Sequence, residues 1–288
     1  FGIWHLGSRD PKCQMPNAEF LMLELLQGAV LGLIQGLTEF FPVSSSGHLI
    51  LLPAFFGWRD QGLAFDTVLH LGTLVAVVWV FRRDISVTLR GAFVQHDRAA
   101  KRLFYQIVVA SLPGIILGGL FGSAIETAMR GPLPVAFDLA FWGLVLFAAD
   151  RWSAKRESAT RDVSRVTWHQ ALAVGLSQAL ALLPGTSRSG ITMTGGLLSG
   201  LDRSTAVRFS FLVSIPTISA AGAYGLFNLL RDGAPGGAAW ELLTGFLVAT
   251  AAGIWAIRFL RSYVEKHSFD IFVYYRLALA VLVILVLR

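Results

Sequence analysis

The chain has 288 residues, of which 55% are hydrophobic and only 15% are charged, and its mean hydropathy is +0.62. Soluble domains carry about 25% charged residues, so this chain has too few polar side chains to cover a water-exposed surface. We therefore expect an integral membrane protein. The single cysteine, Cys13, excludes a disulfide framework and any multi-cysteine metal site. The net charge of +6 does not indicate a nucleic-acid partner, because the basic residues lie in short loops between apolar segments.

The N-terminal tail, residues 1–18, is polar, contains two prolines and does not begin with methionine. Met15 and Met22 are candidate starts, and no cleavable signal peptide is indicated. We exclude this tail from functional reasoning. Residues 19–288 are expected to form a single transmembrane domain.

Membrane-spanning helices need about 20 mostly apolar residues. Two long apolar stretches, about 21–57 and 169–200, are each interrupted by a run of proline, glycine and serine, which a helix does not continue through cheaply. Non-helical backbone at membrane depth survives only where protein or a water-filled cavity satisfies it, so both stretches are interpreted as re-entrant helical hairpins with buried polar tips. The predicted fold is an all-α polytopic bundle with about six full spans plus these two hairpins. The six predicted spans are roughly 63–81, 103–122, 133–149, 207–230, 239–257 and 269–287.

Orientation follows from lysine and arginine in the short loops. Three loops are rich in these residues: 82–102, 150–168 and about 258–268. They are predicted to face the cytoplasm, which places both chain ends outside. The first hairpin then enters from the outside and the second from the cytoplasmic side.

The two interrupted stretches resemble each other at a fixed offset of 143 residues. Chance similarity is one explanation in a chain rich in glycine and leucine, but polar residues also match in register. An inverted repeat of interrupted helices builds a site near the membrane midplane, with repeat 1 over about 21–122 and repeat 2 over about 169–257. The matching segments are Gly32-Leu-x-Gln-x-Leu37 with Gly175-Leu-x-Gln-x-Leu180, and Ser44-x-Ser-Gly47 with Ser187-x-Ser-Gly190.

Intramembrane polar and ionisable residues are costly, which makes each one a candidate for function. Arginine donates a planar fork that suits phosphate, and turns of serine and glycine before a helix form an anion cradle. The combination suggests phosphoryl transfer: Glu39 holds a divalent cation, a serine or water attacks, His48 moves the proton, and Arg188 stabilises the phosphoryl oxygens. The other candidates, predicted to bind substrate, are Gln35, Ser44, Ser46, Gln178, Ser187, Ser189 and Thr192.

Each candidate also has a structural explanation. Serine and glycine allow close helix packing in membranes, His48 fits a buried histidine with satisfied hydrogen bonds, and Arg188 by itself fits a side chain that reaches the cytoplasmic surface. Glu39 is harder to explain in this way, because no lysine or arginine lies within a helical turn of it.

Two long motifs resemble the signatures of the undecaprenyl-diphosphate phosphatase family, also called the bacitracin-resistance family. The segment Gln35-Gly-Leu-Thr-Glu-Phe-Phe-Pro-Val-Ser-Ser-Ser-Gly-His48 is similar to the first signature, and Pro184-Gly-Thr-Ser-Arg-Ser-Gly-Ile-Thr192 is similar to the second. The segment Asp66-Thr-Val-Leu-His-Leu-Gly-Thr73 also looks like the one that follows the first signature. The resemblance covers nearly the whole chain from about residue 22.

The resemblance implies an enzyme of the bacterial inner membrane that removes the terminal phosphate of undecaprenyl pyrophosphate. The product is the lipid carrier reused in cell-wall synthesis, and bacitracin resistance is implied as well. The family is expected to need Mg²⁺ or Ca²⁺, and Ser45 matches its candidate nucleophile, with water as the alternative. Gln35 occupies a position that the family fills with glutamate or glutamine, which leaves Glu39 as the single carboxylate of the motif and puts a two-carboxylate metal site in doubt.

Two other functions were weighed. Inverted repeats of broken helices are also a transporter architecture, so a lipid-carrier flippase or transporter is the alternative. An acid-phosphatase-like lipid phosphatase is disfavoured, because no histidine follows Arg188 before His267. The active site is expected to open to the outer, periplasmic face, and the sequence leaves open whether the protein forms a homodimer.

Overall fold

The structure, a computed structural model, describes residues 18–58, 62–156, 158–232 and 239–287. The tail, apart from Ala18, and Cys13 therefore lie outside the described residues. Within the described ranges the chain is helical, and the only β-type pairing there is an isolated bridge between Thr160 and Leu201. The helices are α1 Ala18–Thr38, α2 Ser45–Phe56, α3 Gly62–Phe93, α4 Arg98–Met129, α5 Pro132–Ser153, η1 Val163–Arg165, α6 Trp168–Ala179, η2 Leu180–Leu182, α7 Arg188–Leu198, α8 Arg203–Asp232, α9 Ala239–Val264 and α10 Asp270–Val286.

Six helices of the described chain are long and apolar enough to cross a membrane, which confirms an all-α polytopic membrane protein. Five of them coincide with the predicted spans, and the sixth is α1 rather than the predicted span at 269–287. The α10 helix has 17 residues, the lower limit for crossing the hydrocarbon core. The six segments are Leu21–Thr38, Ala64–Phe93, Arg98–Ile125, Pro132–Ser153, Arg203–Leu229 and Ala239–Val264.

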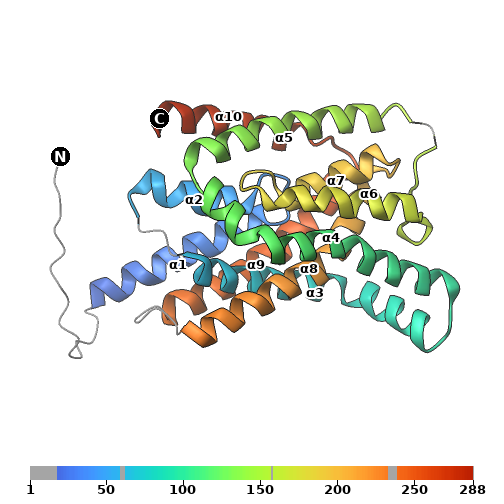
Figure 1. The fold of residues 1–288 in the computed structure, drawn as a ribbon, viewed down its shortest axis with the longest axis horizontal. Helices are drawn as coiled ribbons and strands as arrows, with labels where there is room; N and C mark the ends of the chain where they lie inside the picture. Colours follow the sequence, from blue (N-terminus) through green and yellow to red (C-terminus); the bar gives the residue numbers. More distant parts are fainter. Residues whose placement is uncertain (1–17, 59–61, 157, 233–238, 288) are drawn as a thin grey trace.

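Both interrupted stretches fold as helix–loop–helix units, with a break where the sequence places proline, glycine and serine. The first helix of each unit ends at Thr38 or Ala179, and the second begins at Ser45 or Arg188. Figure 1 shows α1 and α2 entering the bundle from one end and α6 and α7 from the opposite end, so that their loops meet inside it. That the two units are re-entrant in a bilayer, and that the repeats have the predicted bounds, stay predictions.

The three basic segments gather at one end of the bundle. There Arg151 at the end of α5 forms an ion pair of 2.6 Å with Asp270 at the start of α10, and Arg208 of α8 pairs with Asp84 of α3. These pairs join segments that are far apart in the sequence, and the chain turns between α3 and α4 at this same end (Figure 1). The shared end agrees with a common cytoplasmic side for the basic loops, which stays a prediction.

Glycines spaced four residues apart let α1 lie directly on α9. A Cβ built at Gly28 would be 2.5 Å from the carbonyl oxygen of Glu241, and one at Gly36 would be 2.6 Å from the carbonyl oxygen of Ala249. Small residues at four-residue spacing permit this close approach of helix backbones in membranes. The contact fixes the end of α1, and therefore the loop that follows it.

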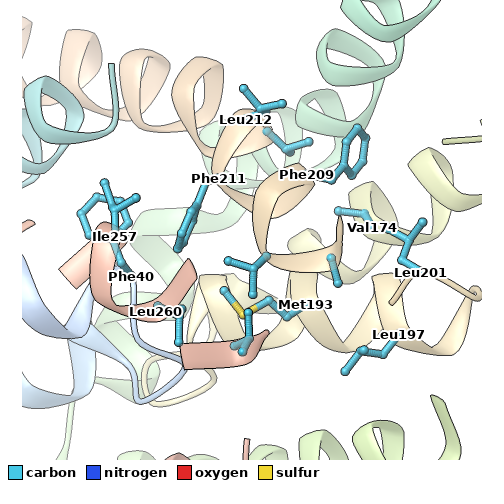
Figure 2. Close-up of a cluster of buried hydrophobic side chains, with 14 of the residues drawn as sticks. Phe40, Val174, Met193, Leu197, Leu201, Phe209, Phe211, Leu212, Ile257 and Leu260 are labelled. Carbon is cyan, nitrogen blue, oxygen red and sulfur yellow. The ribbon is translucent and has the colours of Figure 1, made fainter. Parts of the chain in front are cut away.

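The main hydrophobic core surrounds these loops. Phe40, in the first loop, is fully buried and meets Phe211 of α8 edge to face, with ring centroids 5.4 Å apart. Figure 2 shows the same cluster continuing through Met193 of α7 and Leu260 of α9. Side chains from both repeats thus form one core, which holds the two loops rigidly against each other.

Candidate active site

The two loops have the same local structure. Ser44 and Ser187, which are 143 residues apart, both have a φ of 74°, a left-handed conformation that is uncommon for residues other than glycine. Each caps the helix that follows: the Ser44 hydroxyl accepts from Gly47 N at 3.3 Å, and the Ser187 hydroxyl accepts from Gly190 N at 3.1 Å. Backbone strain of this kind gathers at functional sites. The sequence match at this offset therefore extends to the backbone.

The two loops touch each other at their helix starts. Arg188, the first residue of α7, places its Nη2 atom 2.6 Å from Glu39 Oε1. Ser189 donates to the carbonyl oxygen of Phe41 at 3.0 Å. The predicted meeting of an arginine from the second loop with a carboxylate from the first is thus observed.

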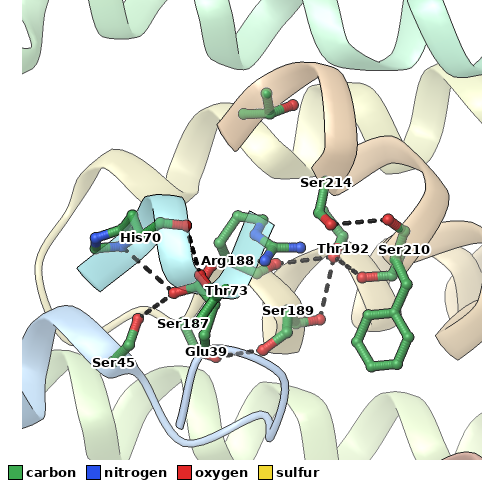
Figure 3. A network of polar contacts seen from close by, with 12 residues as sticks. Glu39, Ser45, His70, Thr73, Ser187, Arg188, Ser189, Thr192, Ser210 and Ser214 are labelled. Atoms are coloured by element: carbon green, nitrogen blue, oxygen red, sulfur yellow. Dashed lines mark hydrogen bonds and ion pairs between the residues drawn. The ribbon is translucent and has the colours of Figure 1, made fainter. Parts of the chain in front are cut away.

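Glu39 lies at the centre of the site, with only 5% of its side chain exposed. Its Oε2 atom accepts from Ser45 Oγ at 2.6 Å and from Gln35 Nε2 at 3.1 Å, and it lies 3.4 Å from His70 Nε2. Figure 3 shows Ser45, His70 and Arg188 converging on this carboxylate from three elements. One carboxylate therefore gathers a hydroxyl, an imidazole and a guanidinium.

A cavity of about 190 Å³ opens beside this cluster. It is lined from both repeats, since Glu39 and Ser45 come from the first loop and Ser187 and Arg188 from the second. Within the described chain, Arg188 Nη1 is buried and has no hydrogen-bond partner. The remaining lining residues are Ser46, His70, Gly114, Gln178, Ala181, Leu182, Thr217, Ile218 and Ala221.

His48, predicted to move the proton, is not among the residues that line this cavity. Its Nδ1 atom lies 2.6 Å from the carbonyl oxygen of Ser44, which can only accept, so Nδ1 carries a hydrogen. Its Nε2 atom lies 2.6 Å from the hydroxyl of Tyr275, and the two rings stack. Both ring nitrogens of His48 are thus already used in binding α2 to α10.

The other predicted substrate-binding residues divide between the cavity and its support. Ser46, Gln178 and Ser187 line the cavity. Thr192 lies behind α7, where its hydroxyl is 2.6 Å from that of Ser210, and Ser189 bonds the first loop as described above. Gln178 donates to Thr217 at 3.0 Å.

His70 is a site residue that the sequence reasoning did not select. It projects from α3, and its Nδ1 atom is 2.7 Å from the carbonyl oxygen of Asp66 one turn earlier, which directs Nε2 toward Glu39. A histidine inside an apolar span is itself a functional signal, and the surrounding segment 66–73 was already noted as resembling the family. Arg276 of α10 was missed in the same way.

The oxygen atoms at the site fit a divalent cation that is shared with a bound phosphate. Mg²⁺ in phosphate-binding sites is held by one or two carboxylates together with substrate oxygens, and Glu39 supplies one carboxylate. The amide oxygens of Gln35 and Gln178 are buried and have no hydrogen-bond partner among the described residues. A cage made of protein side chains alone does not fit, since the described residues contain no group of three or more His, Cys, Asp or Glu side chains placed to hold an ion.

Comparison with known proteins gives one consistent result. Residues 28–282 match the family described as bacitracin resistance protein BacA. The chain is 46% identical to an undecaprenyl-diphosphatase of Moorella thermoacetica, across 92% of this chain and 98% of that protein. It is also 46% identical to an undecaprenyl-diphosphatase of Rubrobacter xylanophilus, across 91% and 98%. The identity to undecaprenyl-diphosphatase 2 of Stutzerimonas stutzeri is 44%, across 91% and 98%.

Proposed function

The chain belongs to the bacitracin resistance protein BacA family, and we propose that it hydrolyses undecaprenyl diphosphate to undecaprenyl phosphate and inorganic phosphate. The relatives that carry the name undecaprenyl-diphosphatase match almost their whole length, which favours an enzyme over the transporter alternative. The reaction returns the lipid carrier to cell-wall synthesis in the bacterial inner membrane.

The observation that carries the proposal is the hydrogen bond from Ser45 Oγ to Glu39 Oε2, at 2.6 Å, on the wall of the cavity. A serine hydroxyl is a weak nucleophile until an adjacent base takes its proton, and Glu39 Oε2 is placed to do so. Arg188 faces the same space with an unpartnered Nη1 atom. A nucleophile, a base and an anion-binding donor thus share one cavity.

The reaction then proceeds in two displacements. Ser45 Oγ attacks the terminal phosphorus while its proton passes to Glu39 Oε2, the bond from that phosphorus to the bridging oxygen breaks, and the lipid phosphate leaves. Water then attacks the phosphoserine, releases inorganic phosphate and restores the hydroxyl. Arg188 Nη1 stabilises the charge on the phosphoryl oxygens throughout.

Two further features favour a doubly anionic headgroup. The helices α2 and α7 both begin at the cavity, and the N-terminus of a helix attracts anions through its free N–H groups and its dipole. A bound Mg²⁺ or Ca²⁺, held by Glu39 and the neighbouring amide oxygens, would neutralise further phosphate charge.

We further propose that the cavity opens toward the outer face. Its lining residue His70 is eight positions from Gly62 and 23 from Phe93, the two ends of α3. At 1.5 Å per residue these are about 12 Å and about 35 Å, so this wall lies near the end opposite the basic loops. If those loops are cytoplasmic, the headgroup enters from outside while its prenyl tail stays in lipid.

Phosphate release by the purified protein in detergent tests the function, because no gradient exists there to drive transport. We expect release from undecaprenyl diphosphate, loss of release in Ser45→Ala, and normal release in the control Ser123→Ala, a serine exposed on α4. Acid quenching with substrate labelled on its terminal phosphate should leave label on the Ser45 peptide. Full activity of Ser45→Ala would refute the role of Ser45, and an inactive wild-type protein would refute the function.

A further inference from the structure

Arg276 lies in the middle of α10, and its side chain is fully buried. Taking a guanidinium out of water is costly unless its N–H groups are hydrogen-bonded. All the printed hydrogen bonds of this side chain go to backbone carbonyl oxygens. Nε donates to Leu139 at 2.9 Å, Nη1 to Pro42 at 3.1 Å, and Nη2 to Asp138 at 3.2 Å, Gly185 at 3.1 Å and Thr186 at 3.1 Å.

Two of these carbonyls are equivalent positions of the repeat. Pro42 and Gly185 are separated by the same 143 residues as the two capping serines, and each lies two residues before its serine. Backbone carbonyls in such a loop have no helical partner, and a buried carbonyl needs one. Arg276 therefore bonds the same group of both loops at once, from a helix that belongs to neither loop.

Neighbouring glycines leave room for this side chain. A Cβ built at Gly190 would lie 3.2 Å from Nη1 of Arg276, and one at Gly143 would lie 3.3 Å from its Nε. Gly190 is in the first turn of α7, directly behind the second loop. The guanidinium is thus enclosed by the loops that it joins.

We propose that Arg276 is a positioning residue that holds the two loops in register, so that Glu39 and Ser45 of the first meet Arg188 of the second. The planar fork suits this task because its donors point in fixed directions toward two separate loops. A lysine carries the same charge but has a single nitrogen, which cannot bond both loops in the same way. Tyr275, the preceding residue, adds a second link from α10 by bonding His48.

An activity-independent measurement tests this arrangement. Spin labels at Phe56 and Leu198, exposed residues near the far ends of α2 and α7, report the relative placement of the two helices that begin at the loops. With the native cysteine replaced, we expect a narrow distance distribution in the parent protein. Arg276→Met and Arg276→Lys should both broaden it. An unchanged width in Arg276→Lys would overturn the proposal, and this variant decides the matter if Arg276→Met does not fold.

A kinetic cycle gives a second test, which rests on the proposed function. Misplacing catalytic groups by about 1 Å can lower turnover about 10²-fold, so we expect a loss of that size in Arg276→Met. Because Arg276 acts through Arg188, adding Arg188→Lys should then cost much less than it does alone. Losses that simply multiply would show a general structural defect and overturn the proposal. Arg258→Met, at an exposed position of α9, serves as control.

The two tests fail in different ways. A wild-type protein that releases no phosphate would refute the function, while the spin-label distances would still report whether Arg276 holds the loops. An active wild-type protein whose distances ignore Arg276 would refute only the positioning role.

Discussion

Replacing Arg188 by lysine separates the charge of this residue from its geometry. In the structure Nη2 is engaged with Glu39 at 2.6 Å, while Nη1 is buried and has no partner in the described chain. The guanidinium can therefore hold the carboxylate with one nitrogen and a phosphoryl oxygen with the other. The lysine ammonium is a single point of charge and cannot serve both in the same directions.

The size of the effect follows from the loss of one aligned donor. Removing one such donor from a transition-state oxyanion costs about 10²–10³ in turnover, or about 2.7–4 kcal/mol, and we expect Arg188→Lys to fall in this range. Stability should change little, because the positive charge beside Glu39 is kept. Arg188→Met, by contrast, leaves a buried carboxylate uncompensated, which typically costs about 3–5 kcal/mol of folding stability.

The assay is the initial rate of phosphate release from undecaprenyl diphosphate by detergent-solubilised protein, with the midpoint of thermal unfolding measured on the same samples. Arg188→Lys should be slow but folded, and Arg188→Met should be both inactive and less stable. Turnover of Arg188→Lys within about threefold of wild type would refute the assignment, since a loss of about 10²-fold or more is required. Arg188 would then be a structural partner of Glu39.

Three further results are expected. Glu39→Gln should abolish phosphate release, since the attacking hydroxyl loses its proton acceptor; retained release would exclude Glu39 as the base. Gly28→Ala should lower the free energy of unfolding by about 1–3 kcal/mol through overpacking against α9, whereas Gly119→Ala, where a Cβ meets nothing within 4 Å, should not, and equal effects would contradict the packing argument. In spheroplasts of a variant lacking the native cysteine, an impermeant thiol reagent should label Ser46→Cys but not Ser158→Cys; the opposite pattern would reverse the topology.

The amino-acid sequence by itself determined the membrane class, the helix breaks and the chemistry of the two motifs. Apolar length and clusters of proline, glycine and serine act locally, so the breaks before Ser45 and Arg188 fall where they were expected. The repeated serine pattern predicted two equivalent loops, and Ser44 and Ser187 indeed adopt the same backbone conformation. Even the pairing of Glu39 with Arg188 followed from two buried opposite charges, since each requires a partner in a low-dielectric interior.

The tertiary structure decided which histidine and which additional arginine approach these loops. His48 lies in the motif, but packing of α10 brings Tyr275 to its ring, whereas α3 brings His70 to Glu39. Arg276 reads in the sequence as an isolated charge in a terminal helix, and its carbonyl partners lie 90 or more residues away. Such contacts depend on how α3, α5 and α10 pack around the loops, and the hydropathy or spacing of a single segment carries no information about that packing.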